Sequence, residues 1–349
     1  MLEFKKDGLK AALVLAPTLI LMLVFTFYPI IRTLATAFME NYVFGGVGEL
    51  EWNLWDILAG KPNEFSGTEQ IYVDYGDGTL YLEDVPVYVQ TGLGFGIFKK
   101  VLSDPLFWKA MKNTVIMVLI SVPVTIVISL LISVALNSIK KLQGFFQTIF
   151  FLPYVTNTIA LGLVFSFLFS TNYGLINTII VSLGGERMAW INAVNSELQP
   201  TYSSCLFVLM IYTVWNGLAF KIMVFLSGMQ SIDKQYYQAA QIDGTSKWRT
   251  FTKITVPLLG PMIIYITITS FIGAFKAYTS IISLFGGNFG PHNDKTMLIT
   301  VVGYVYNSLT VNTSLNAISK ASAGSLILFA IIMLITLVQM QVNKKKVHY

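Results

Sequence analysis

Charged residues are scarce in this chain of 349 residues: Asp, Glu, Lys and Arg together make up only 12% of it. Soluble domains carry about 25% charged residues, which they need to cover their surface. Hydrophobic residues make up 54%, so an ordinary soluble domain is excluded and a chain that crosses a membrane several times is expected. The net charge of +5 does not predict nucleic-acid binding, because the basic residues are scattered between apolar runs.

Cysteine and histidine are also rare, with one and two residues respectively. The single Cys205 cannot form an intrachain disulfide, and its apolar neighbours favour a small buried side chain. His292 and His348 lie far apart and have no Cys or His companion, so we expect no metal and no other cofactor. The chain lacks a phosphate-binding P-loop, a Ser-His-Asp set and an H-E-x-x-H helix, so we expect a non-catalytic protein with any ATP hydrolysis on a separate chain.

Six apolar runs are long enough to cross a hydrocarbon core of about 30 Å as helices. The sequence therefore predicts an all-α polytopic membrane protein with the spans Ala11–Ile31, Asn113–Leu136, Phe145–Phe169, Ser203–Gly228, Leu258–Tyr278 and Ala321–Met340. Two shorter runs, Gly174–Leu183 and Met297–Leu309, suit interfacial or re-entrant segments, although an eight-span alternative stays open. The first run is longer than the roughly 7–15 apolar residues of a signal peptide, so we expect it to be retained.

Basic residues in the short connections predict the orientation. In the six-span arrangement the positive-inside rule makes one face cytoplasmic, together with both termini. That face carries Lys5, Lys6, Lys10, Lys140, Lys141, Lys234, Lys247, Arg249, Lys253, Lys344, Lys345 and Lys346. The loop between the first two spans falls on the outer face and holds 11 of the 18 acidic residues. In it, Ile71–Tyr75 and Tyr81–Val89 alternate around Gly76-Asp77-Gly78 and predict a β-hairpin, which could contact a partner or shield a pathway.

The predicted topology divides the chain into four segments. These are an N-terminal cytoplasmic tail with the first span (1–38), a small extracytoplasmic cap (39–112), a membrane core of five spans (113–342) and a basic cytoplasmic tail (343–349). Within the spans the only charges are Lys221 and Lys276, and the lack of carboxylates argues against proton or sodium coupling. We expect both lysines to extend to the nearer membrane surface, with a substrate or gating role as the alternative for Lys221.

The cytoplasmic connection 231–257 predicts a helix, a turn and a second helix. Lys234–Ile242 is compatible with a helix, and Asp243-Gly244 breaks it because glycine adopts positive φ readily. Ser246 can cap a second helix that ends before Pro257. One face of this second helix is predicted to carry Trp248, Phe251, Thr252 and Thr255. Such a hairpin could lie on the bilayer surface or insert into a groove of a partner protein.

A specific pattern in this connection consists of Ala239, Ala240, Asp243, Gly244, Ile254 and Pro257. It resembles the E-A-A loop of permease subunits in binding-protein-dependent ABC importers. Phe225–Ile232 and Leu102–Trp108 are similar to the carbohydrate, maltose-type subfamily. The similarity covers Leu102–Met340, and the additional N-terminal span is typical of the larger subunit of such pairs.

The resemblance implies the six-helix fold of type-1 ABC importer permeases, in a bacterial or archaeal cytoplasmic membrane. It also implies a homologous second permease, two copies of an ATPase, an extracytoplasmic solute-binding protein and a carbohydrate substrate, with an oligosaccharide expected. The residues implied to couple to the ATPase are Tyr237, Gln238, Ala239, Ala240, Asp243, Gly244, Trp248, Phe251 and Pro257. Gln238 departs from the family, which usually has Glu there; glutamine keeps a hydrogen bond but loses the ion pair.

The middle of the fourth span combines aromatic, amide and hydroxyl groups, as sugar sites do. The expected substrate-path residues are Tyr212, Thr213, Trp215, Asn216 and Lys221, and helix packing is the alternative explanation for the aromatic ones. Two other functions stay open on the sequence alone. One is an ABC permease for a non-sugar solute such as a glycerol phosphate or a polyamine, and the other is a secondary carrier or channel that works without ATP.

Overall fold

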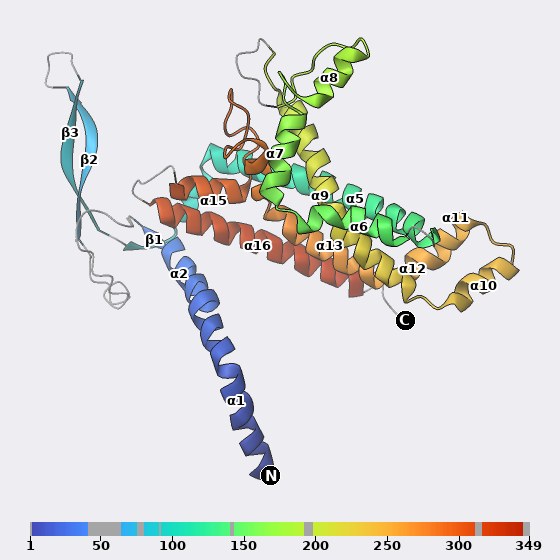
Figure 1. The fold of residues 1–349 in the computed structure, drawn as a ribbon. Coiled ribbons are helices and arrows are strands. Elements are labelled where there is room, and N and C mark those ends of the chain that lie inside the picture. Colours follow the sequence, from blue (N-terminus) through green and yellow to red (C-terminus); the bar gives the residue numbers. More distant parts are fainter. Residues whose placement is uncertain are drawn as a thin grey trace. The chain divides into compact units, whose positions relative to one another are not determined.

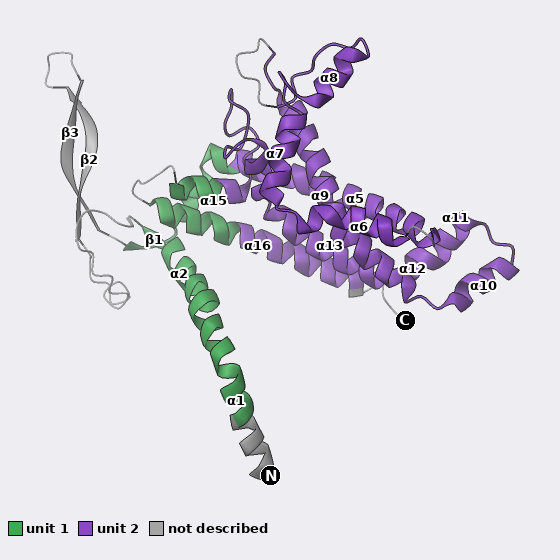
Figure 2. Cartoon of the chain, in the orientation of Figure 1, with its two compact units in different colours: residues 1–107, 304–327 green, residues 108–303, 328–349 purple. Residues whose placement is uncertain are grey.

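The computed structural model describes residues 2–40, 64–74, 80–90, 92–139, 143–191, 198–310 and 316–344 (Figure 1). Two compact units are distinguished, residues 1–107 with 304–327 and residues 108–303 with 328–349 (Figure 2). The units reflect which parts of the chain pack together. The segments 1–38, 39–112, 113–342 and 343–349 follow the predicted membrane topology instead, and that division stays a prediction.

A nearly continuous helix begins the first unit. It consists of α1 (Leu2–Met22), the π-helical turn η1 (Leu23–Phe27) and α2 (Tyr28–Ala37). The most apolar window of Lys10–Ala37 has no buried residue within the chain, as is typical of a helix that is hydrophobic all round and surrounded by lipid. Strand β1 (Met39–Glu40) follows and pairs antiparallel with β4 (Gly92–Leu93), which precedes α4 (Gly96–Leu102).

The predicted hairpin of the outer loop is confirmed. Strands β2 (Glu64–Asp74) and β3 (Leu80–Gln90) pair antiparallel with Glu64 opposite Gln90 and Asp74 opposite Leu80. The predicted turn at Gly76-Asp77-Gly78 lies outside the described residues.

The remaining helices include those long and apolar enough to cross a membrane. They are α5 (Pro105–Ser138), α6 (Gln143–Val155), α7 (Thr158–Leu168), α8 (Leu175–Ser182), α9 (Tyr202–Gln230), α13 (Gly260–Phe275), α14 (Thr279–Leu284), α15 (Val301–Thr310) and α16 (Ala317–Lys344). Among the described residues, four candidate spans are single helices, and two bent helix pairs bring the number to six. The six predicted spans coincide with these, which confirms the all-α polytopic fold. Helices α8 and α15 have 8 and 10 residues, so the eight-span alternative has no support.

The third predicted span is not one straight helix. Helices α6 and α7 meet at an angle of 98°, so the expectation of continuous helix over Phe145–Phe169 is corrected. Asn157 has an extended backbone, and its side-chain Oδ1 accepts hydrogen bonds from the amides of Ile159 at 2.8 Å and Ala160 at 3.4 Å. The bend arises because this cap satisfies the first amides of α7, which no longer need the carbonyls of α6.

A second bend follows the connection 231–257. This connection contains α10 (Lys234–Ile242), α11 (Lys247–Thr250), the π-helical turn η2 (Phe251–Thr255) and α12 (Val256–Leu258). The segment Lys247–Leu258 makes an angle of 67° with α13. The expectation that the second helix ends before Pro257 is wrong, because Pro257 lies within α12.

The π-helical turn explains how the helix continues through this proline. Proline has no N–H to donate, and in a regular α-helix its ring clashes with the carbonyl four residues earlier. In η2 the amide of Val256 donates five residues back, to the carbonyl of Phe251, and this widens the turn before Pro257. The same arrangement precedes Pro29, where the amide of Tyr28 donates to the carbonyl of Leu23.

The core of the second unit lies along α9. Leu218, Ile222 and Leu226 follow one another at four-residue spacing, which places them on one helix face, and they cluster with Leu136 and Leu259. A Cβ on Gly228 would lie 3.0 Å from Leu259 Cδ2 and from Met262 Cγ. Close helix approach at a small residue is typical of membrane proteins, where packing rather than water exclusion holds helices together.

Candidate functional site

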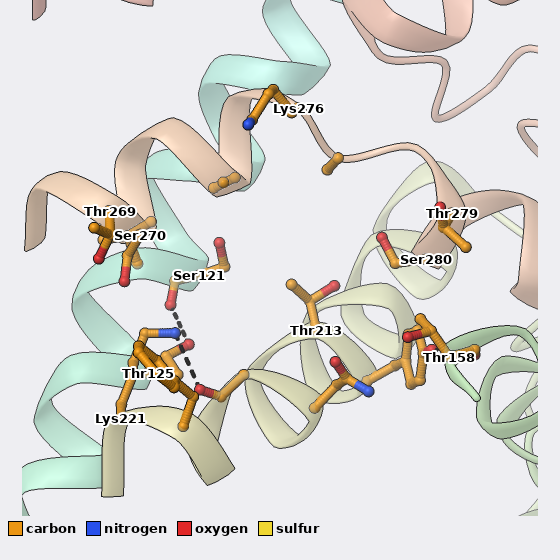
Figure 3. Close-up of a pocket in the computed structure, with 18 of the residues that line it drawn as sticks. Ser121, Thr125, Thr158, Thr213, Lys221, Thr269, Ser270, Lys276, Thr279 and Ser280 are labelled. Carbon is orange, nitrogen blue, oxygen red and sulfur yellow. Dashed lines mark hydrogen bonds between the residues drawn. The ribbon is translucent and has the colours of Figure 1, made fainter. Parts of the chain in front are cut away.

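A pocket of about 480 Å³ opens among α5, α7, α9, α13 and α14 of the second unit (Figure 3). Eight of its lining residues carry a Ser or Thr hydroxyl: Ser121, Thr125, Thr158, Thr213, Thr269, Ser270, Thr279 and Ser280. In Figure 3, Ser121, Ser270 and Thr125 lie on one side, whereas Thr279 and Ser280 lie on the other. Such a lining offers both donors and acceptors to a polyhydroxylated ligand.

Four of the five expected substrate-path residues line this pocket: Tyr212, Thr213, Asn216 and Lys221. At about 100° per residue, Tyr212, Thr213 and Asn216 share one side of α9, whereas Lys221 is turned about 180° from Tyr212 yet still borders the pocket. Trp215 does not line it. The ring centroid of Trp215 lies 5.2 Å from that of Phe165 on α7, so packing, the alternative that the sequence left open, accounts for this residue.

The polar atoms of these residues differ in whether they have partners. Tyr212 is fully buried, and its hydroxyl donates to the carbonyl of Thr158 at 2.7 Å, which joins α9 to the start of α7. In contrast, Thr213 Oγ1 and Asn216 Nδ2 are buried without a hydrogen-bond partner in the described part of the chain. Unpaired buried polar atoms are costly, so a bound solute that pairs with them would gain affinity.

Both lysines of the predicted spans reach the pocket (Figure 3). Lys221 Nζ donates to the carbonyl of Gly217, one turn earlier, at 3.0 Å. Lys276, at the end of α13, was expected to extend outward, yet it also lines the pocket. Sequence reasoning missed it together with Thr269, Ser270, Gly273 and Ala274 of α13 and Ala277 just after that helix. Their recurrence as small residues at helical spacing is the signal that could have identified this face.

The helix–turn–helix predicted for 231–257 is confirmed, with Gly244 at the turn. Gly244 has a φ of +63°, in the region that favours glycine. Its amide donates to the carbonyl of Gln241 at 3.1 Å, and the amide of Thr245 donates to the carbonyl of Ala240 at 2.9 Å. These two bonds form a Schellman motif, which satisfies the last carbonyls of α10.

Capping side chains define the start of each arm of the hairpin. Asp233 Oδ1 accepts from the amide of Gln235 at 2.9 Å, and Ser246 Oγ accepts from the amide of Arg249 at 3.3 Å. The expected cap at Ser246 is therefore present, and both helices have defined beginnings.

The residues implied to couple to an ATPase are not equally accessible. Gln238, Ala239, Asp243, Gly244, Trp248 and Pro257 are exposed, Tyr237 and Phe251 are half-buried, and Ala240 is buried within the chain. The predicted single face of the second helix is not maintained, because Trp248 is 69% exposed whereas Thr255 is buried. The intervening π-helical turn changes the helical repeat, so residues at four-residue spacing no longer align.

Two large exposed side chains on the hairpin were not anticipated. Ile242 is 86% exposed and Tyr236 is 53% exposed. Trp248 is 69% exposed, and we name these three exposed side chains, Tyr236, Ile242 and Trp248, the apolar tip. Large apolar side chains that a chain leaves exposed are candidates for contact with a partner.

Polar bonds fix the segment between α14 and α15. Asn113 Nδ2 donates to the carbonyls of Met297 at 3.1 Å and Ile299 at 2.9 Å, and Asn113 Oδ1 accepts from the hydroxyl of Tyr202 at 3.1 Å. Lys109 Nζ lies 2.9 Å from Asp294 Oδ2. These contacts hold α5, the start of α9 and this segment in a defined arrangement.

The carboxylate of Asp294 receives enough hydrogen bonds to remain ionised. Burial by itself would raise its pKa, but the bond from Lys109 and those from the amide and hydroxyl of Thr296, at 3.0 and 2.9 Å, outweigh burial and lower the pKa below 3.8. Among the described residues there is no group of three His, Cys, Asp or Glu side chains that could hold a metal ion.

Comparisons with known proteins identify similar sequences over most of the chain. The family described as "Binding-protein-dependent transport system inner membrane component" matches residues 126–347. The lactose transport system permease protein LacF of Rhizobium radiobacter is 33% identical over 217 residues, which are 61% of this chain and 69% of that protein. The multiple sugar-binding transport system permease protein MsmF of Streptococcus mutans is 32% identical over 254 residues, 72% of this chain and 81% of that protein.

A more distant relative covers nearly the whole chain. The sulfoquinovosyl glycerol transport system permease protein SmoG of Agrobacterium fabrum is 26% identical over 340 residues, 97% of this chain and 92% of that protein. Among solved structures, a bacterial ABC transporter involved in the import of the acidic polysaccharide alginate is similar with a TM-score of 0.71 at 18% identity, over 98% of this chain and 97% of that one. This last likeness shows a shared fold.

Proposed function

Because this chain belongs to the family of binding-protein-dependent transport system inner membrane components, we propose that it forms half of the path of an ATP-driven importer for a carbohydrate, in particular an oligosaccharide. Family membership makes it a non-catalytic, multi-pass inner membrane permease of an ABC transporter. It confirms the resemblance carried by Ala239, Ala240, Asp243 and Gly244. It also excludes the alternative of a carrier that works without ATP.

The carbohydrate assignment is supported by the relatives and by the pocket. LacF and MsmF are named for lactose and for multiple sugars. The pocket presents hydroxyl side chains from five helices, and Thr213 Oγ1 and Asn216 Nδ2 lack partners there. A sugar, with several hydroxyls that both donate and accept, matches such a lining better than an apolar solute would.

The single observation that carries the coupling proposal is the exposed apolar tip on a hairpin between two pocket-lining helices. The hairpin connects α9 to α13, and both helices contribute residues to the pocket. A protein that grips Ile242 and Trp248 therefore acts directly on two of the five helices around the site. Shifting the populations of two gate conformations from 1:99 to 99:1 requires about 5.5 kcal/mol of differential binding. The partner must therefore bind the hairpin tightly in one of the two conformations.

The proposed assembly contains this chain, a homologous second permease and two ATPase copies bound to the cytoplasmic hairpins. An extracytoplasmic solute-binding protein delivers the sugar at the opposite face. Both termini lie in the cytoplasm of a bacterial or archaeal cell, because the basic connections share that side. The coupling residues are the exposed Gln238, Ala239, Asp243 and Trp248 together with Ile242, whereas Tyr237, Ala240, Gly244, Phe251 and Pro257 maintain the shape of the hairpin.

Co-purification tests this assembly. An affinity-tagged chain should retain an ATPase subunit, and Ile242→Asp should abolish its retention because a carboxylate would be buried unpaired at the interface. The matched control is Leu183→Asp, since Leu183 is 82% exposed but lies at the end of α8, outside the hairpin. Equal retention by wild type and Ile242→Asp would contradict the proposal.

The solute class is tested separately. Thermal-shift screening of the cognate binding protein should give stabilisation by sugars. Stabilisation by a glycerol phosphate or a polyamine, with no response to any sugar, would replace the carbohydrate assignment and leave the permease assignment intact.

A further inference from the structure

The charges around the pocket are all of one sign. Lys221 and Lys276 line it, and no Asp or Glu is among its described lining residues. The sequences of the five helices that form it, α5, α7, α9, α13 and α14, contain no carboxylate at all. The positive charge is therefore not balanced by a residue on any element packed around the pocket.

Neither ammonium group has an anionic partner in the described part of the chain. Lys221 Nζ makes one hydrogen bond, to the carbonyl of Gly217 at 3.0 Å, and an ammonium has three N–H groups to donate. Lys276 Nζ has no hydrogen bond or ion pair there. A charge within a membrane-spanning helix, as at Lys221 in α9, is costly unless it is paired. An anion in the pocket would pair with Lys221, and the exposed Lys276, just after α13, lines the same pocket.

The rest of the lining indicates what carries that anion. Eight Ser and Thr side chains and Asn216 line the same pocket as the two lysines, and they suit a ligand with many hydroxyl groups. Figure 3 shows Ser121, Ser270 and Thr125 on the same side of the pocket as Lys221, so charge and hydroxyl recognition occur side by side.

We propose that this pocket takes a saccharide that bears an anionic group, such as a carboxylate, sulfonate or phosphate, and that Lys221 and Lys276 recognise the anion. The inference rests on the proposed function, since it specifies the solute class of the same pathway. Charge-assisted hydrogen bonds are about twice as strong as neutral ones, so the two lysines discriminate charged from neutral saccharides. A polyamine is disfavoured, because the same lysines repel it.

Binding of matched pairs to the full chain, purified in nanodiscs with the subunits that co-purify, tests the proposal. The first pair is digalacturonate and its uncharged dimethyl ester, and the second is glucose 6-phosphate and glucose. At least one anionic member should bind about tenfold or more tightly than its neutral partner, which corresponds to roughly 1.4 kcal/mol. Lys221→Gln and Lys276→Gln should each remove most of this preference, by weakening binding of the anionic member much more than binding of the neutral member.

Two further variants separate charge from folding. Lys221→Arg and Lys276→Arg keep the charge and should retain the preference. Lys112→Gln, an exposed lysine on α5 outside the pocket, should change nothing. Equal binding within both pairs, or a preference unaffected by either Gln variant, would overturn the anion proposal and leave a sugar permease. A third outcome would overturn both the carbohydrate and the anion proposals. In it, the chain retains its ATPase and binds a non-saccharide solute, but it binds no member of either saccharide pair.

Discussion

The hydroxyl of Tyr237 on α10 lies 3.2 Å from the hydroxyl of Thr255 in η2, across the two arms of the hairpin. Thr255 is buried, and Tyr237 is half-buried. The residue that sequence similarity placed against an ATPase therefore bonds within its own chain. This bond, together with the Schellman motif at Gly244, makes the hairpin a single stiff element.

Removing that hydroxyl should loosen the hairpin without altering its surface. We expect Tyr237→Phe to reduce hairpin stability by about 1 kcal/mol, the net value of a typical hydrogen bond, and to increase amide exchange in α10. Tyr236→Phe is the matched control, because Tyr236 is exposed. Hydrogen exchange followed by mass spectrometry measures both variants, and equal exchange in the two would contradict a stabilising role for the bond.

Gly244 should not tolerate a β-branched residue. A Cβ at this position would meet nothing within 4 Å, so the cost comes only from the φ of +63°. We expect Gly244→Val to destabilise the turn by about 1–2 kcal/mol and to weaken ATPase retention in a co-purification assay. Gly244→Asn should retain the partner, since asparagine adopts this conformation more readily. Retention by both variants would indicate that the turn is not required.

Gln238 is exposed on α10, where related permeases usually carry Glu. Restoring the carboxylate should strengthen ATPase binding at low salt, because a carboxylate can form an ion pair with a basic partner residue where glutamine forms only a neutral hydrogen bond. We expect the Gln238→Glu variant to retain more ATPase, with an advantage that falls as ionic strength rises. Gln235→Glu serves as the control on the same helix. A salt-independent gain, or a gain from both variants, would contradict this account.

The pair of Lys109 and Asp294 predicts a pH-dependent stability. The lowered pKa of Asp294 means that its contribution is complete above the ordinary value of 3.8 and is lost as the pH falls through the depressed value. Both side chains are 38% exposed, so screening limits the contribution to about 1 kcal/mol or less.

Thermal unfolding of the purified chain measures this contribution. At pH 7, Lys109→Gln should unfold at a lower temperature than wild type, and the difference should shrink as the pH falls below 3.8. Lys295→Gln is the neighbouring control, since this lysine is exposed. A difference that persists unchanged to the lowest pH would assign the effect of Lys109 to packing.

The sequence predicted the membrane-spanning pattern well, because apolar run length is a direct physical requirement of the bilayer. It did not predict the bend at Asn157, since that residue lies within a run whose apolar content continues on both sides. It identified Tyr212, Thr213 and Asn216 because the middle of the fourth span combines aromatic, hydroxyl and amide groups. The same reasoning included Trp215, which packs against Phe165 instead. The contributions of α13 and α14 to the pocket depend on how helices far apart in the sequence pack together. Residue spacing within a single helix does not predict that packing.

The hairpin illustrates the same limit. Its turn was predictable because Asp243-Gly244 and Ser246 act locally. The exposure of Ile242 was not, since a large apolar side chain in a helix is ordinarily expected to pack against its own chain. The burial of Ala240 likewise depends on how the two arms meet, which the resemblance to other permeases did not specify.

The π-helical turn at Phe251–Thr255 has a geometric consequence for the apolar tip. In an α-helix each residue turns the chain by about 100°, and a π-helical turn accommodates one residue more than an α-helical path would. Deleting one residue there would rotate everything on the far side by roughly a quarter of a circle or more about the helix axis. A one-residue insertion beside Pro257 therefore sets the direction, about the helix axis, in which Trp248 and Ile242 face the proposed ATPase.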